Sequence, residues 1–390
     1  MRIGIDARLL NETGVGRYIR NLIEQLKELD KENQYIVYLS ENTFSSFVLP
    51  NNRWEKRLAT PHWHTLWEQI AMPFLFLKDN LDLLHVPYFN IPIFYPKKYI
   101  ATIHDLTILH FPTGKASLLF PILYWLKFLA FKLILAIGLK RSAGIITPSE
   151  TTKQEIIEHF NISGEKIKVT YEGVDAKISR ILSCHSCESR NLKMPDQVRH
   201  DKKPKNPYFL YVGNAYPHKN LEILIDAFGD FLEKNKGKNR YVLLLVGKND
   251  VFYTRLQAYV KEKNLNQSVL FNGSADDKTL QELYGGAEAF VFPSLMEGFG
   301  LPALEAISLG TPVICSDIPI FHEILGDLPY YINPKDRYSI SLSFFSIDAI
   351  QNAFAERKKE RMALMKQYSW KQLGAETLNY YQSSSLSSHT

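Results

Sequence analysis

The sequence predicts an α/β protein made of two doubly wound, Rossmann-like domains that face a cleft. Short apolar runs that suit buried parallel strands alternate with apolar residues at helical spacing. This alternation occurs twice, before and after a polar stretch at residues 183–205. The chain has 390 residues, 45 % of them hydrophobic, and this is enough to build two full cores.

Composition excludes several classes of protein. Charged residues make up 22 % of the chain, which argues against wholesale disorder, and a net charge of +5 does not by itself argue for a nucleic-acid partner. The three cysteines, Cys184, Cys187 and Cys315, are too few for a disulfide scaffold and fit a reducing compartment. The first residues lead into a strand without the apolar core of a signal peptide, so we expect a cytoplasmic protein.

The first domain begins with a strand, a glycine loop and a helix. The strand covers residues 3–5, and apolar residues recur at helical spacing over residues 19–26. Gly14 and Gly16 lie between them, but the three-glycine fingerprint of dinucleotide-binding proteins is incomplete. We expect Gly16 to let a phosphate approach the backbone at the start of the helix. Arg17 is either a phosphate ligand or a solvated residue of the first turn.

Two further strands follow, at residues 35–39 and 81–87. The segment 63–69 between them is rich in aromatic residues, which could stack on a sugar, although core packing is the favoured interpretation. His85 and Tyr88 lie at the end of the second of these strands. Ligands gather at the carboxyl ends of parallel strands, so both could face a cleft.

An apolar strand at residues 100–106 delivers His104 and Asp105 to its carboxyl end. A lone histidine in this position is more often structural than catalytic. Asp105 could either orient His104 or cap the following turn.

The most apolar part of the chain is residues 117–139. Lys127 and Lys132 interrupt it, which argues against a transmembrane helix. The favoured interpretation is a buried helix pair in the first domain. The alternative is a surface helix that dips into a membrane and is flanked by basic residues, namely Lys115, Lys140 and Arg141.

The first domain closes with a strand at residues 143–149, a helix capped by Ser149, and a strand at 166–175. The polar stretch 183–205 then indicates an exposed insertion. Its two cysteines are only half of a zinc site. The expected domains are 1–175, joined by a C-terminal helix at 369–381, a linker at 176–206, and a second domain at 207–368.

The second domain opens with a strand at residues 207–213 and a loop at 214–220. Lys219 lies where this loop enters a helix, a position that suits a diphosphate. Two more strands, at residues 242–246 and 269–273, are expected to flank a nucleobase through backbone groups.

A strand-to-helix turn at residues 297–305 carries the strongest functional signal. It follows a buried strand at 289–292 and contains two glycines, whose free N–H groups can cradle an anion. A carboxylate stands at each end, Glu297 in the loop and Glu305 inside the helix. Carboxylates suit sugar or ribose hydroxyls and amides suit phosphate, so the turn predicts a ligand such as a nucleotide sugar.

This turn, together with Pro293-Ser294 before it and residues 310–317 after it, resembles the donor-site motif of retaining glycosyltransferases of family four. The resemblance implies the GT-B architecture over nearly the whole chain. It also implies that Glu297 contacts the donor sugar and that Glu305 holds the ribose hydroxyls. The Gly-Val-Gly-Arg-Tyr and His-Asp-Leu segments resemble those of bacterial polysaccharide mannosyltransferases.

The same resemblance implies a set of site residues. His104 would lie beside the anomeric centre, so the expected catalytic residues are His104, Asp105 and Glu297. The expected donor- and phosphate-binding residues are Gly14, Gly16, Arg17, Lys219, Gly298, Phe299, Gly300, Leu301 and Glu305. No metal and no cofactor is expected. The chain departs from the family at Glu172, where an asparagine is usual, and at Asn214 and His218, which replace a usual arginine.

The implied activity is retaining transfer of a sugar, with mannose as the first candidate. The donor would be GDP- or UDP-linked and the acceptor a glycan or lipid-linked glycan of a polysaccharide or cell envelope, with possible contact with the inner membrane. A front-face route suits a site with no obvious nucleophile near His104, and Lys219 with the helix N-termini would stabilise the departing diphosphate. The alternatives are a nucleotide-sugar epimerase, a non-catalytic nucleotide-sugar-binding homologue and, less favoured, an NAD dehydrogenase.

Overall fold

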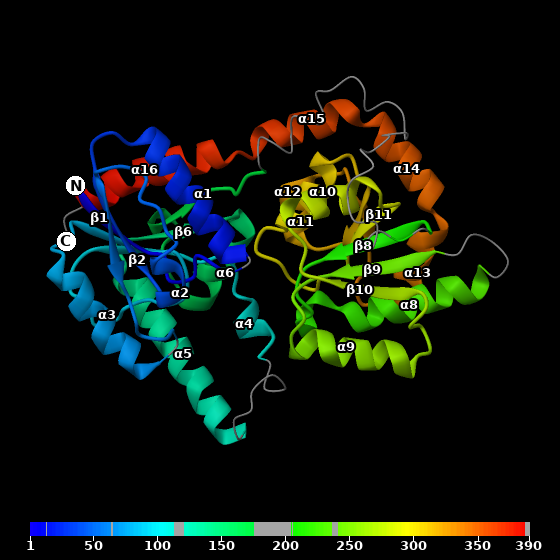
Figure 1. The fold of residues 1–390 in the computed structure, drawn as a ribbon, viewed down its shortest axis with the longest axis horizontal. Coiled ribbons are helices and arrows are strands. Elements are labelled where there is room, and N and C mark those ends of the chain that lie inside the picture. Colours follow the sequence, from blue (N-terminus) through cyan, green and yellow to red (C-terminus); the bar gives the residue numbers. More distant parts are fainter. Residues whose placement is uncertain are drawn as a thin grey trace. The chain divides into compact units, whose positions relative to one another are not determined.

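The computed structural model describes residues 1–12, 14–63, 65–112, 121–174, 204, 206–235 and 241–386. The chain forms two compact units, Met1–Gly173 with Ser369–Thr390, and Val174–Tyr368 (Figure 1). Apart from residue 204, the expected insertion at 183–205 lies outside the described residues, as do His64 and Lys115.

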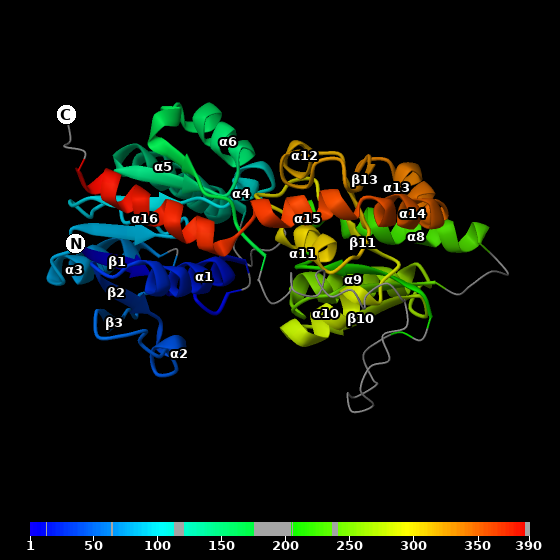
Figure 2. The same ribbon diagram turned by 90° about the horizontal axis from the view of Figure 1, so that it is seen from above.

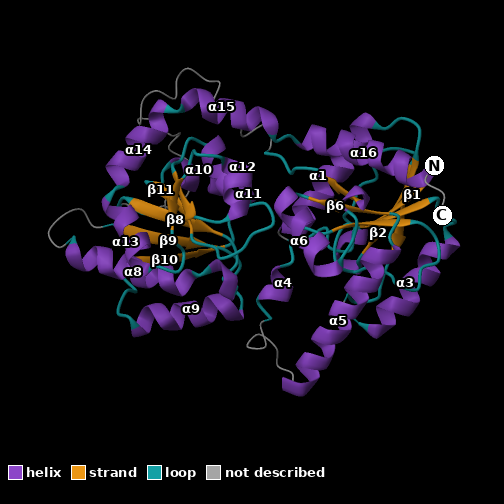
Figure 3. Cartoon of the chain, turned by 180° about the vertical axis from the view of Figure 1, so that it is seen from behind, coloured by secondary structure: helices purple, strands orange, loops and turns teal. Residues whose placement is uncertain are grey.

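The first unit is built on a parallel sheet with the strand order β3-β2-β1-β4-β5-β6-β7. The inner strand β1 pairs with β2 on one side and β4 on the other, so that Ile3 lies opposite Tyr35 and Leu83. These strands are buried on both faces, as expected where helices cover a parallel sheet (Figure 3). The strands are β1 (Arg2–Asp6), β2 (Gln34–Leu39), β3 (Trp54–Leu58), β4 (Leu83–Val86), β5 (Tyr99–Thr102), β6 (Gly144–Thr147) and β7 (Ile167–Val169).

Its helices follow the crossover pattern of a doubly wound fold. They are α1 (Gly14–Leu29), α2 (Glu41–Phe44), α3 (Leu66–Lys78), α4 (Thr107–His110), α5 (Pro121–Arg141), α6 (Glu150–Phe160), the 3₁₀ turn η2 (Gly164–Lys166) and α16 (Trp370–Leu386). Ser149 caps α6 as predicted, since its side chain accepts a hydrogen bond from the Thr152 N–H.

The C-terminal helix α16 packs along α1, and the two lie side by side in both views (Figures 1 and 2). The contact is close, because a Cβ on Gly374 would lie 2.4 Å from the Gln25 Cβ. The helix continues beyond its expected end near Tyr381 to Leu386. Ser384 is buried and the hydroxyls of Ser383 and Ser385 donate to backbone carbonyls, so these serines continue the helix.

Two expectations for the first unit are wrong. Residues 121–141 form one helix, α5, whose Leu135 is buried but whose Leu129 is 65 % exposed, so it is not a buried helix pair. In the aromatic segment, Trp67 is 64 % exposed, and the buried side chains are the polar Glu68 and Gln69, which bond to other segments of the unit.

The second unit has a parallel sheet with the order β10-β9-β8-β11-β12-β13. Its strands are β8 (Tyr208–Val212), β9 (Val242–Val246), β10 (Val269–Gly273), β11 (Ala289–Phe292), β12 (Val313–Ser316) and β13 (Tyr330–Ile332). Its helices are η4 (Pro217–Lys219), α8 (Leu221–Lys234), α9 (Val251–Glu262), α10 (Asp277–Gly285), α11 (Leu301–Ser308), α12 (Pro319–Leu325), α13 (Arg337–Phe345), α14 (Ile347–Glu356) and α15 (Lys358–Gln367). Because β8 and β11 are neighbours, the loops that follow them meet at one edge of the sheet.

Candidate functional site

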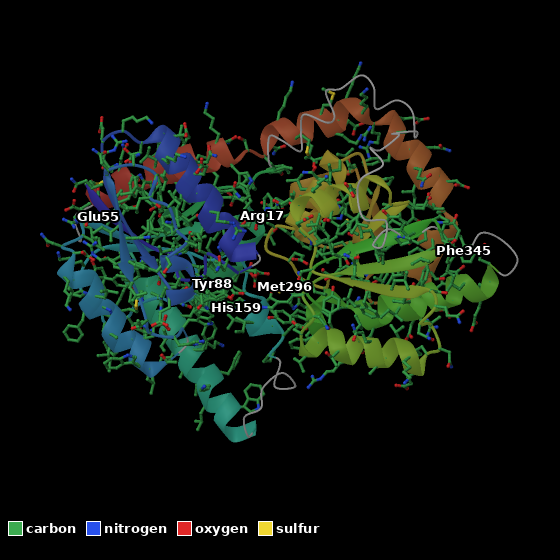
Figure 4. All side chains as sticks on the ribbon, in the orientation of Figure 1. Arg17, Glu55, Tyr88, His159, Met296 and Phe345 are labelled. Carbon is green, nitrogen blue, oxygen red and sulfur yellow. The ribbon has the colours of Figure 1, made fainter. Side chains whose placement is uncertain are left out.

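The glycine loop of the first unit is shaped by internal packing. Gly16 is buried, and a Cβ there would lie 2.5 Å from the Leu10 carbonyl oxygen. The described chain thus makes a close approach that requires this glycine, and the expected approach of a phosphate stays a prediction. Gly14 is exposed with open space where its Cβ would stand. Arg17 is half-buried in the first turn of α1 (Figure 4).

A buried ion network that the sequence did not reveal stands at the end of β1. The Arg8 guanidinium donates to Asp6 Oδ2 and to Glu68 Oε1, both at 2.6 Å, and to the Pro61 carbonyl at 3.0 Å. Burial alone would lower the pKa of Arg8, but the two carboxylates outweigh it and raise that pKa. This network joins β1 to the start of α3.

His104 follows β5 and is held on both ring nitrogens. Its Nε2 lies 3.1 Å from the Pro87 carbonyl oxygen, and its Nδ1 lies 3.3 Å from Glu172 Oε1. Tyr18 of α1 meets the ring edge-on, with 4.8 Å between ring centroids. The His104 and Glu172 side chains are 12 % and 11 % exposed. Glu172 was noted in the sequence only as a departure from the family, and it is the functional candidate that sequence reasoning missed.

Asp105 caps the turn that follows it. Its Oδ1 accepts a hydrogen bond of 2.8 Å from the Thr107 N–H at the start of α4. Of the two roles considered for Asp105, the structure shows the capping one. Burial, and then the charges of Asp105 and Glu158, raise the pKa of Glu155 on α6 to about 7.

His85 does not face a cleft, because its side chain is fully buried. Its Nδ1 lies 2.6 Å from the Tyr381 hydroxyl of α16, and its Nε2 lies 2.7 Å from Thr102 Oγ1. Burial, and then the charge of His104, lower the pKa of His85 to about 3. His85 is therefore a neutral core histidine that ties the C-terminal helix to the sheet.

In the second unit, the loop after β8 is fastened to the loop after β11. Asn220 adopts a left-handed conformation, with φ of 62°, and donates to the Pro293 and Pro334 carbonyls at 3.1 and 2.7 Å. The Leu295 N–H donates to the His218 carbonyl at 2.8 Å. These bonds place Lys219 beside the predicted donor motif.

Lys219 and Glu297 form an ion pair with 2.6 Å between Nζ and Oε1. Both side chains are largely buried, at 12 % and 11 % exposed. The ammonium also lies 5.4 Å from the centre of the Phe292 ring. Burial, and then the charge of Lys219, lower the pKa of His218 to about 3, so this neighbour is neutral near pH 7. The structure thus brings together two residues predicted from separate motifs.

The turn after β11 contains both glycines of the predicted donor motif. Gly300 has φ of 86°, in the left-handed region, and a Cβ there would lie 2.7 Å from the Phe321 ring. Gly298 and Phe299 are buried, and Phe299 meets Tyr368 edge-on at 5.6 Å. Leu301 begins α11, so the glycine turn leads directly into the N-terminus of this helix.

Glu305 is placed inside α11 and is 5 % exposed. Ser294, at the start of the same turn, is fully buried, and its hydroxyl has no hydrogen-bond partner within the described residues. The second unit thus gathers Lys219, Glu297, Glu305 and a glycine turn at the carboxyl ends of β8 and β11. Glycine turns and charged groups in this position bind phosphorylated ligands.

Solved structures share this architecture. A glycosyltransferase from Rickettsia africae matches with a TM-score of 0.69 at 16 % identity, covering 99 % of both chains. The Anabaena protein HepE in complex with UDP-glucose matches with a TM-score of 0.72 at 15 % identity, covering 98 % of this chain and 100 % of HepE. The two-sheet α/β fold is therefore that of the GT-B class, as the sequence predicted.

Family models and curated relatives make the assignment more specific. Residues 13–178 match the model Glycosyltransferase Family 4, and residues 194–343 match Glycosyl transferases group 1, so the two cover about four fifths of the chain. The O-antigen chain mannosyltransferase RfbU of Salmonella typhimurium is 27 % identical over 88 % of this chain and 89 % of its own length. The O-antigen chain mannosyltransferase B of Escherichia coli is 26 % identical over 95 % of this chain and 96 % of its own length. The chain belongs to this glycosyltransferase family, which confirms the resemblance, and it is a glycosyltransferase.

Proposed function

We propose that this enzyme is a retaining mannosyltransferase that transfers mannose from GDP-mannose to a glycan of a surface polysaccharide. The donor sugar is inferred from the two O-antigen mannosyltransferases that it matches over most of their length. The observation that carries the proposal is the Lys219–Glu297 pair, which stands beside the glycine turn of the second unit. The alternatives of an epimerase and a non-catalytic homologue gain no support from these relatives, which are transferases.

The donor end of the proposed site works through charge and hydroxyl recognition. Lys219 and the N–H groups at the start of α11 bind the diphosphate and stabilise its charge as it departs. The diphosphate competes with Glu297 for Lys219, which frees the Glu297 carboxylate for hydroxyls of the sugar. Glu305 binds the ribose hydroxyls. No metal or cofactor takes part in this proposal, and a nucleotide sugar is the donor.

The proposed route is front-face transfer. The bond from the anomeric carbon to the diphosphate oxygen breaks first and leaves a short-lived oxocarbenium-like sugar. The acceptor oxygen then bonds to the same face, and its proton passes to the departing diphosphate. His104 contributes by contact with a donor-sugar hydroxyl. Anomeric configuration is retained because attack and departure share one face.

The acceptor is proposed to be a lipid-linked glycan presented at the cytoplasmic face of a membrane. Among the described residues, no helix is both long enough and apolar enough to span a bilayer. Contact with the membrane would therefore be peripheral.

A panel of nucleotide sugars separates the proposed function from its rivals. Purified enzyme is incubated with GDP-mannose, UDP-glucose and UDP-galactose, with and without a mannosylated acceptor, and released nucleoside diphosphate is measured. We expect release from GDP-mannose that depends on the acceptor, and NMR of the product should show the same anomeric configuration as the donor. Release without acceptor would favour the epimerase alternative, and binding without release would favour the non-catalytic one.

A further inference from the structure

Helix α5 exposes a stripe of large apolar side chains. Leu126, Leu129 and Leu133 are 60, 65 and 59 % exposed, and their spacing of three and four residues places them on one face. The buried side of the helix is represented by Leu135 and Leu139, which are fully covered. A helix that only needed to pack on the sheet would carry polar residues on its outer side.

Helix α3 exposes a second stripe. Leu66, Trp67, Ile70 and Phe74 are 81, 64, 48 and 64 % exposed, although Met72 on the inner side is buried. Isolated exposed apolar residues are ordinary, but two continuous stripes on one unit are typical of an interaction surface.

The loop after β4 joins the two helices into one surface. Gln69 of α3 donates to the Ile91 carbonyl and accepts from the Ile93 N–H, both at 3.1 Å. On the other side, Arg141 of α5 donates to the Ile93 carbonyl. Phe94 of this loop is 64 % exposed between them. We call the exposed side chains of α3, Phe94 and α5 the α3–α5 face.

The exposed charged residues of α3 and α5 are all basic. Helix α5 contains no acidic residue and carries four basic ones, Lys127, Lys132, Lys140 and Arg141, all exposed. The one acidic residue of α3, Glu68, is buried against Arg8. Apolar side chains with a basic surround match the interface of a bilayer that contains anionic lipids, whereas a homodimer contact would place these like charges together.

We propose that the α3–α5 face docks the enzyme on an anionic bilayer, with the apolar stripes at the level of the acyl chains and the lysines among the headgroups. This deepens the proposed function, because it names the surface that would bring the first unit to a lipid-linked acceptor. It does not depend on the identity of the donor.

Vesicle flotation tests the face directly. Full-length enzyme is mixed with phosphatidylcholine vesicles with or without about a third phosphatidylglycerol. We expect flotation with the anionic vesicles and a loss of at least about tenfold in partitioning for L129Q/L133Q, since burial of these apolar side chains in the bilayer interface stabilises the docked state. W67Q/F74Q should lose a similar amount. The matched control is L342Q/F345Q, which changes apolar residues of α13 that are 43 and 45 % exposed in the second unit.

Three outcomes would overturn the docking surface. These are an enzyme that does not float, α3 and α5 variants that float like the parent, and an enzyme that dimerises in sedimentation and becomes monomeric in these variants. The last result would assign the face to a second copy of the chain. Binding of nucleoside diphosphate and transfer to a soluble acceptor are measured in parallel. They should be unchanged in the variants, so a failure of docking is distinguishable from a failure of the proposed activity.

A separate observation concerns Glu172. Burial of a carboxylate lowers the stability of the fold unless the carboxylate is paired. The largely buried Glu172 lies beside an imidazole nitrogen, with 3.3 Å between its Oε1 and His104 Nδ1. The Pro87 carbonyl engages the other nitrogen, and Tyr18 closes one edge of the ring. The geometry assigns Glu172 as a positioning residue that fixes the orientation of the His104 ring, and its effect on transfer rests on the function proposed for His104.

A split between kcat and KM tests Glu172. We expect E172L to lower kcat by about 10–100-fold with the donor KM changed less than threefold, because a misplaced group costs transition-state contacts more than binding. E172Q, which keeps an oxygen of the same reach, should recover part of that loss. D30N is the control, since Asp30 is another buried carboxylate of this unit. It precedes β2 and so lies at the amino ends of the strands, whereas His104 follows the carboxyl end of β5. Equal kcat in E172L and the parent, or no recovery in folded E172Q, would overturn the assignment.

Discussion

Lys219 and Glu297 neutralise each other where the chain leaves β8 and β11. The family's usual arginine is replaced here by the half-buried His218, whose low pKa leaves it uncharged near neutral pH. The proposed diphosphate site therefore depends strongly on a single ammonium group.

Substitution of Lys219 tests this dependence. K219A should lower transfer by at least about a hundredfold, because a positioned cation that stabilises a leaving group supplies about 3 kcal/mol or more. H218R on the parent background should tighten binding of nucleoside diphosphate, measured by calorimetry. K234A is the control, since Lys234 lies at the far end of α8, the helix that follows the turn of Lys219. Full activity in K219A would show that another group carries the leaving-group charge.

The two glutamates of the donor turn, Glu297 and Glu305, should affect different kinetic quantities. E297Q should lower kcat about a hundredfold, since the contact with the sugar strengthens in the transition state. E305Q should weaken nucleoside diphosphate affinity by about 1.5–3 kcal/mol, as expected for a charged hydrogen bond to ribose. Steady-state kinetics and calorimetry on both variants make the comparison. The ribose assignment is wrong if E305Q binds the diphosphate nucleotide as tightly as the parent.

At the scale of elements, α16 is fastened to the first unit by its tyrosines. Tyr381 lies 2.6 Å from His85 Nδ1, and the Tyr380 hydroxyl donates to the Lys166 carbonyl at 2.7 Å. These contacts join the last helix to β4 and to the start of β7. The helix therefore belongs to the core of the first unit, although it is the last element in sequence.

Removal of one hydroxyl should loosen this helix. Y381F leaves a buried imidazole nitrogen without its partner, so we expect the first unit to lose about 1–3 kcal/mol of stability. Hydrogen exchange should show faster exchange of α16 amides. The control is Y338F, which removes a hydroxyl from a side chain that is 63 % exposed in the second unit. Equal α16 protection in Y381F and the parent would mean that apolar packing alone holds the helix.

At the scale of the whole molecule, the sequence predicted the structure best where a motif spans only a few neighbouring residues. Strand, glycine turn and helix around residues 297–305 were predicted because each signal lies within a few positions. Lys219 and Glu297 were both predicted, and they meet because β8 and β11 are neighbours. Their contact required the strand order, which periodicity alone does not supply.

The misses have the same origin. Glu172 reaches His104 from the end of β7, across a sheet whose order the sequence does not state. The apolar content of α5 could not reveal which of its sides would be covered. Each miss depends on which segments pack together in the folded chain, and the periodic pattern of the sequence does not reveal this.

Both units carry a histidine that burial keeps neutral, which makes the whole molecule sensitive to acid. The pKa is lowered to about 3 for His85, by burial and then His104, and to about 3 for His218, by burial and then Lys219. An unfolded chain binds a proton at each histidine near pH 6.5, whereas the folded chain does not until about pH 3. The stability from these groups is thus complete above pH 6.5 and is lost as the pH falls toward 3.

Urea unfolding at two pH values measures this effect. Between pH 7.5 and pH 5.0, each histidine should remove about 2 kcal/mol from the unfolding free energy of its own unit, at about 1.4 kcal/mol for each unit of pH below 6.5. H85Q should flatten the pH dependence of the transition of the first unit, and H218N that of the second. H62N is the control, because His62 is exposed. If H85Q and H218N lose stability between these pH values as steeply as the parent, protons bound elsewhere govern the acid response.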